Sequence, residues 1–160
     1  MTPMEGIGFG RPKPILYAAA ALSLVAALIH LWVMPEHFRE WWGYGAFFLV
    51  SAVAQVLYVA LLLRWPNRGI LLLGVGGNLA IASLYLLTRT AGIPFFGPHA
   101  GEAEGVGFSD LCATASELGI VVALGAVLLR GLPSDRRRLV LIVAAIAVVS
   151  VGHIVHLLLR

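Results

Sequence analysis

Five apolar runs of about 20 residues each dominate this sequence and limit the folds open to it. A hydrocarbon core of roughly 30 Å takes about 20 helical residues to cross. Inside lipid, each segment must satisfy its own backbone N–H and C=O groups, and a helix does so. The sequence therefore predicts an all-α integral membrane bundle that forms a single domain over residues 1–160. Its five transmembrane helices are expected at about 15–34, 45–63, 70–88, 108–129 and 139–159.

Composition supports a membrane protein and excludes several other classes. Hydrophobic residues make up 60% of the chain and charged residues only 12%, whereas about a quarter of a soluble domain is charged. The single cysteine, Cys112, excludes an internal disulfide, a CxxC metal site and an iron–sulfur cluster. No pattern of a nucleic-acid-binding surface is present. The lipid bilayer is therefore the predicted partner, and association with another membrane protein or with further copies of the chain remains open.

Arginine and lysine are distributed unevenly between the two sides of the predicted bundle. Eight of the eleven basic residues lie in the N-terminal tail and in the loops at 64–68 and 130–138. Short cytoplasmic loops of membrane proteins carry such an excess. The N-terminus is thus predicted to be cytoplasmic. The C-terminus and the loops at 35–43 and 89–107 are predicted to be extracytoplasmic.

All five histidines fall on the extracytoplasmic half of this topology. His30 lies about one turn from the outer end of the first predicted helix. The last predicted helix carries His153 and His156, three residues apart. Glu117 lies within the fourth helix, where a carboxylate costs a few kcal/mol to insert and therefore usually has a partner. At about 1.5 Å of rise per residue, these four side chains lie roughly 5–13 Å below the outer membrane boundary. They are expected to share one layer.

These residue types favour a transition-metal site open to the extracytoplasmic side. Imidazole and carboxylate bind Zn, Cu(II) or Fe, while the lack of a Cys or Met cluster argues against Cu(I). Histidines at i and i+3 share a helical face, so one ion can bind both members of the pair in the last helix. The expected ligands are His30, Glu117, His153 and His156, followed by Asp110 and His99. Metal sensing, storage, delivery or a metal-dependent membrane enzyme would fit such a site, and whether the chain is an enzyme stays open.

Two other functions fit the same histidines. Haem b needs two imidazoles on facing helices, and His30 with His153 or His156 would supply them as cofactor ligands. Alternatively, the polar layer only holds the bundle of a structural or partner-binding subunit together. Proton-linked transport ranks below the metal and haem functions, because five helices without a repeat make a poor alternating-access transporter. The glycines at 74, 76 and 77 favour close helix packing over a haem slot.

Two stretches resemble a group of known sequences, "HLWVMPEHFREWWGYGAFFL" and "LTRTAGIPFFGPHAGEAEGVGFSDL". They look like segments of small uncharacterised polytopic membrane proteins of high-GC, actinobacterial-type bacteria, over about residues 28–120. The resemblance implies a multi-pass protein of the bacterial inner (cytoplasmic) membrane and carries no function. It also implies that the matching polar residues belong to one feature; these are His30, Glu36, His37, His99, Glu102, Glu104, Asp110 and Glu117.

Overall fold

The computed structural model describes residues 14–138 and 141–142, and within them every regular element is helical. The helices are α1 (Pro14–Glu40), α2 (Trp42–Arg64), α3 (Arg68–Thr90) and α4 (Phe108–Arg130). Each of the four is long and apolar enough to cross a membrane. The prediction of an all-α fold is therefore confirmed, with helices at the first four expected spans. The fifth predicted span, 139–159, lies outside the described residues except at 141–142.

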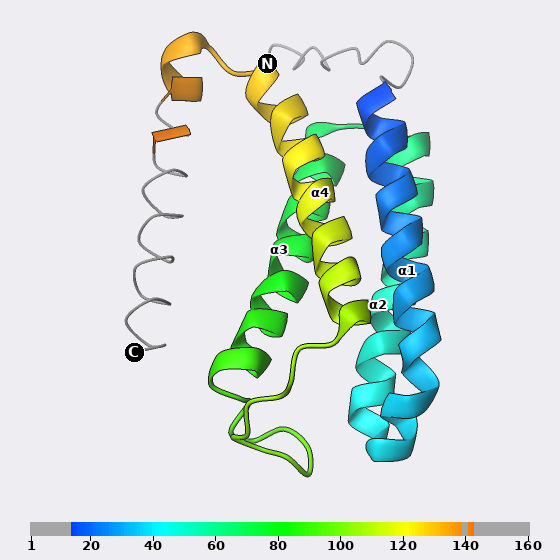
Figure 1. The fold of residues 1–160 in the computed structure, drawn as a ribbon. Coiled ribbons are helices and arrows are strands. Elements are labelled where there is room, and N and C mark those ends of the chain that lie inside the picture. The colour runs from blue at the N-terminus through cyan, green and yellow to red at the C-terminus, as the bar shows by residue number, and fades with distance from the viewer. Residues whose placement is uncertain (1–13, 139–140, 143–160) are drawn as a thin grey trace, which may run out of the picture. The chain divides into compact units, whose positions relative to one another are not determined.

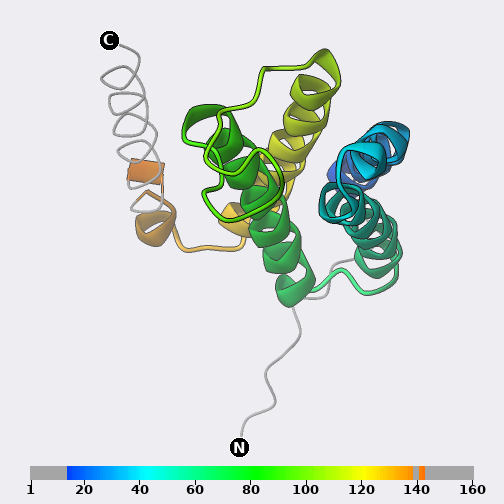
Figure 2. The ribbon, with the colours of Figure 1, turned by 90° about the horizontal axis from the view of Figure 1, so that it is seen from below.

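The chain divides into two compact units, residues 1–125 and 126–160. In the first unit α1 and α2 pack side by side in opposite directions, α3 runs opposite to α2, and α4 returns opposite to α3 (Figures 1 and 2). The α1–α2 turn and the loop at 91–107 consequently lie at the same end of this unit (Figure 1). In the described part of the second unit, the Arg137 backbone N–H donates to the Pro133 carbonyl at 2.9 Å and forms a helical turn.

Helix α1 extends beyond its expected end at residue 34 and contains Pro35. Proline has no N–H, so it removes one hydrogen bond to the carbonyl one turn earlier, but the helix is able to continue past it. Only Trp41 separates α1 from α2, and this tight reversal brings the two helices close together. A side chain at Gly45 would run into the Phe38 ring, so the reversal requires a glycine there.

A chain of buried polar side chains joins the first three helices near mid-bundle. The Ser23 hydroxyl donates to the Gln55 side chain and lies 3.1 Å from the Gln55 backbone carbonyl. The Gln55 amide donates to Asn78 at 2.9 Å, and the Asn78 amide donates to the Gly74 carbonyl at 2.7 Å. Because lipid offers these groups no hydrogen bonds, they satisfy one another inside the protein. Polar side chains of α2 and α3 therefore face each other inside the protein.

Gly74 allows this close approach, and we predict that replacing it destabilises the bundle. A Cβ atom there would overlap the Tyr58 side chain and lie 2.6 Å from a Leu124 methyl group. Overpacking of this kind costs about 1–3 kcal/mol, so Gly74→Leu should clearly lower the melting temperature in detergent. Gly76→Leu is the matched control, because no described atom lies within 4 Å of its added Cβ. Equal melting temperatures for the two variants would show that α3 does not pack through Gly74.

Candidate functional site

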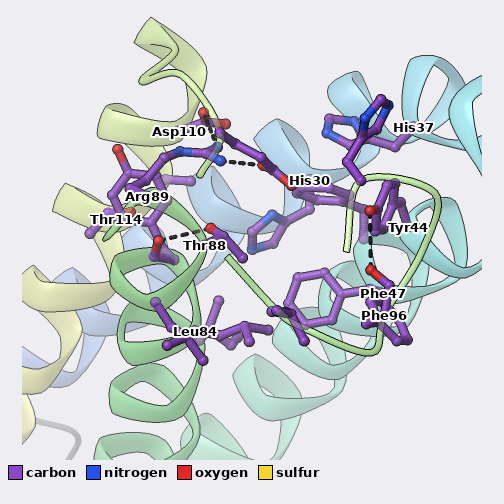
Figure 3. A pocket seen from close by; sticks show the side chains of 18 of the residues that line it. His30, His37, Tyr44, Phe47, Leu84, Thr88, Arg89, Phe96, Asp110 and Thr114 are labelled. Atoms are coloured by element: carbon purple, nitrogen blue, oxygen red, sulfur yellow. Dashed lines mark hydrogen bonds and ion pairs between the residues drawn. The ribbon is translucent and has the colours of Figure 1, made fainter. Parts of the chain in front are cut away.

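A cavity of about 380 Å³ lies at the end of the first unit that carries the α1–α2 turn and the 91–107 loop. Most of its wall is apolar or aromatic and comes from α2, α3 and the loop; this part includes Tyr44, Phe47, Phe48, Ile81, Leu84, Ile93, Phe95 and Phe96 (Figure 3). The polar part comes from α1, α3, α4 and the loop, and consists mainly of His30, His37, Arg89, His99, Glu102, Glu104, Asp110 and Glu117. The cavity thus combines an apolar wall with several ionisable groups.

His30 of α1 and Glu117 of α4 form a buried pair in the wall of this cavity. The His30 Nε2 lies 3.2 Å from Glu117 Oε1, and the two residues are only 3% and 1% exposed. If Glu117 is ionised, it accepts a hydrogen bond from Nε2–H; if it is protonated, it donates to Nε2. A proton can therefore be held on either partner, as in general acid–base pairs. The His30 ring also packs against Phe48, with ring centroids 5.6 Å apart.

Arg89 ties α3, α4 and the loop together on another side of the cavity. Its guanidinium donates to Asp110 of α4 at 2.7 Å and to Glu104 of the loop, and it lies 5.0 Å from the Tyr85 ring centroid (Figure 3). Charge-assisted hydrogen bonds to two carboxylates fix the orientation of the guanidinium plane. The Asp110 side chain also accepts from the Gly107 backbone N–H at 3.1 Å, where the loop enters α4.

The 91–107 loop forms part of the cavity wall and is attached at both sides. Phe96 packs edge-on against Trp41 at a centroid separation of 4.8 Å, and the Tyr44 hydroxyl donates to its carbonyl at 3.3 Å (Figure 3). On the other side, the Glu104 backbone N–H donates to the Thr88 carbonyl at 3.0 Å. The loop therefore connects the α1–α2 turn to the end of α3 across the cavity.

The predicted site residues are brought together only in part. His30 and Glu117, which are 87 residues apart in sequence, meet as a pair. Asp110 binds Arg89, and His99 lies 3.3 Å from Glu102 on the exposed part of the loop, although both line the same cavity. The remaining two predicted ligands, His153 and His156, lie outside the described residues.

The described residues do not assemble the expected cluster of metal ligands. Among them, no group of three or more His, Cys, Asp or Glu side chains is placed to hold a metal ion. Arg89 is one physical reason, because it occupies Asp110 and Glu104 with hydrogen bonds. Shared depth in the membrane does not place side chains at the same point around the bundle. The histidine cluster predicted from the sequence is thus represented here by His30 alone, paired with a carboxylate.

The aromatic wall of the cavity was not apparent from the sequence, and neither were the contacts of Arg89 with both Asp110 and Glu104. The aromatic pair at the start of α2, Phe47 and Phe48, lies within an apolar run, so nothing distinguishes it from lipid-facing residues. For Phe95 and Phe96, the only sequence signal of a place in the cavity wall was that they lie in a Gly- and Pro-rich loop. No family model, curated protein or solved structure matches this chain.

Proposed function

We propose that the chain is an integral membrane protein that binds a small molecule in the cavity at its extracytoplasmic end. The observation that carries this proposal is the buried His30–Glu117 pair in the wall of a largely apolar cavity of about 380 Å³. Small-molecule sites are typically concave, about 300–1,000 Å³, mostly apolar, and provided with a few polar groups. A polar pair buried at the edge of such a cavity is the feature that would orient a ligand.

The proposal includes a topology of five transmembrane helices in the bacterial inner membrane, with the N-terminus cytoplasmic and the C-terminus outside. The distribution of basic residues supports this orientation. Arg64 and Arg68 border the α2–α3 turn, which lies at the end of the first unit opposite the 91–107 loop (Figure 1). The cavity then opens within reach of the extracytoplasmic surface and the outer lipid leaflet.

Binding of an aromatic probe to the protein in lipid nanodiscs tests this function. We expect saturable binding of 4-propylphenol at one site per chain, beyond its partitioning into empty nanodiscs. Ala113 is a buried residue in the cavity wall, so Ala113→Phe should fill the space and weaken binding about tenfold or more. Ala115→Phe is the matched control, because Ala115 is exposed on the same helix and does not line the cavity. Equal binding by wild type and both variants would contradict the proposal.

A transition-metal ion is a second candidate ligand for the same pair. The 3.2 Å between His30 Nε2 and Glu117 Oε1 favours it, because two ligands that each lie about 2.0–2.2 Å from one ion are roughly 3–3.5 Å apart. Elemental analysis of the purified protein should then show stoichiometric Zn, Cu or Fe that is lost in His30→Ala. A Soret absorbance band would instead support the haem b alternative. Neither metal nor probe binding would leave a purely structural role for the polar groups.

A further inference from the structure

Two buried polar atoms in residues that line the cavity have no hydrogen-bond partner within the described part of the chain. They are Nδ1 of His30 and Nε of Arg89. Leaving such an atom unsatisfied is costly, and in native proteins buried polar groups usually have a partner. Nε–H of Arg89 can only donate a hydrogen bond. When the His30 ring is neutral and its Nε2–H donates to an ionised Glu117, Nδ1 can only accept a hydrogen bond.

Each carboxylate in the cavity wall already has a hydrogen-bonding or ion-pairing partner in the protein. Arg89 contacts two carboxylates, Glu104 and Asp110, and Glu117 contacts His30. The fourth carboxylate of the wall, Glu102, lies against His99. A charged ligand would have to displace one of these partners, and a buried charge that loses its partner is strongly destabilised. The arrangement therefore favours an uncharged ligand.

From these observations, and resting on the proposed function, we infer that the cavity takes an uncharged, hydroxyl-bearing aromatic molecule of the phenol or quinol type. Its ring fills the space between the aromatic side chains of α2 and the loop, including Phe47 and Phe96. Its hydroxyl hydrogen is donated to His30, and a ligand oxygen accepts from Arg89. Offset and edge-to-face aromatic contacts supply the remaining complementarity. Such a molecule is also soluble in the lipid from which a membrane cavity can be filled.

A pair of probes that differ only in the hydroxyl hydrogen tests this inference. 4-Propylphenol and its methyl ether, 4-propylanisole, share an apolar body, but the ether cannot donate a hydrogen bond. We expect wild-type protein in nanodiscs to bind the phenol about tenfold more tightly, the effect of one buried hydrogen bond. His30→Phe should bring the ratio close to one. Ser116→Ala is the control: Ser116 is a buried polar residue of α4 that does not line the cavity, and its hydroxyl donates to the Cys112 carbonyl at 2.9 Å, so the ratio should persist.

A measurement on the unaltered protein covers the case in which the His30 variant does not fold. With nitrogen-15-labelled histidine, the ring signal of one histidine should shift when the phenol is added and stay unchanged with the ether. Equal affinities for phenol and ether in wild type, with both lowered by Ala113→Phe, would overturn the hydroxyl inference and leave the proposed function standing. Tighter binding of phenyltrimethylammonium or benzoate than of the phenol would overturn the uncharged class. Absence of binding by every probe would contradict both proposals.

Discussion

Replacing Arg89 with methionine is expected to lower the free energy of unfolding by about 3 kcal/mol, the lower end of the range for breaking a buried ion pair. The Arg89 side chain is only 13% exposed, and that of Asp110 18%, so the Asp110 carboxylate would be left largely buried without its cation. The Glu104 carboxylate is more exposed and contributes less, because solvent screens it. Chemical or thermal unfolding in detergent measures the change.

The same substitution should release the 91–107 loop, since Glu104 connects that loop to α3 through Arg89. Limited proteolysis is then expected to cut within the loop faster in Arg89→Met than in wild type. Arg68→Met is the matched control, because Arg68 is exposed at the other end of the same helix. If Arg89→Met and Arg68→Met had the same stability and the same cleavage rate, Arg89 would not hold the loop.

Replacing Glu117 with alanine is also expected to lower the free energy of unfolding by about 3 kcal/mol. The substitution leaves His30 without its remaining partner and creates a void where a 1%-exposed side chain had been. Glu117→Gln keeps the shape and one hydrogen bond to the ring, so it should cost much less. Glu36→Ala is the control, because Glu36 is exposed on α1. A neutral effect of Glu117→Ala, measured by unfolding in the same detergent, would show that the pair does not hold α1 and α4 together.

The fold was largely predictable because membrane insertion leaves few options. Apolar runs of the right length must become helices in lipid, and the four that the structure describes fall where the sequence places them. The end of α1 differs from the expected residue 34, because the helix continues through Pro35 to Glu40. A proline one turn before a helix end removes a single hydrogen bond, which this helix tolerates.

The sequence was enough to predict that His30 and Glu117 lie at the same depth, but it did not determine which of the predicted ligands come together. Depth along the membrane normal follows from residue number, so His30 and Glu117 were correctly placed in one layer. The angular position of a side chain around its helix and the tilt between helices depend on tertiary packing, which residue number does not determine. Asp110 accordingly contacts Arg89 and not His30, and the part of the aromatic wall that α2 supplies had no sequence signal of its own.

Thiol labelling from the outside most directly tests the central claim, a ligand-binding cavity open toward the extracytoplasmic side. Thr114 lines the cavity from α4, and Cys112 is the only native cysteine (Figure 3). In a Cys112→Ser background, Thr114→Cys should react with a membrane-impermeant maleimide in intact cells, and 4-propylphenol should slow the reaction. Ala52→Cys, at a buried position away from the cavity, should remain unlabelled. Labelling of Thr114→Cys only in inverted vesicles, or at a rate that the phenol does not change, would contradict the account.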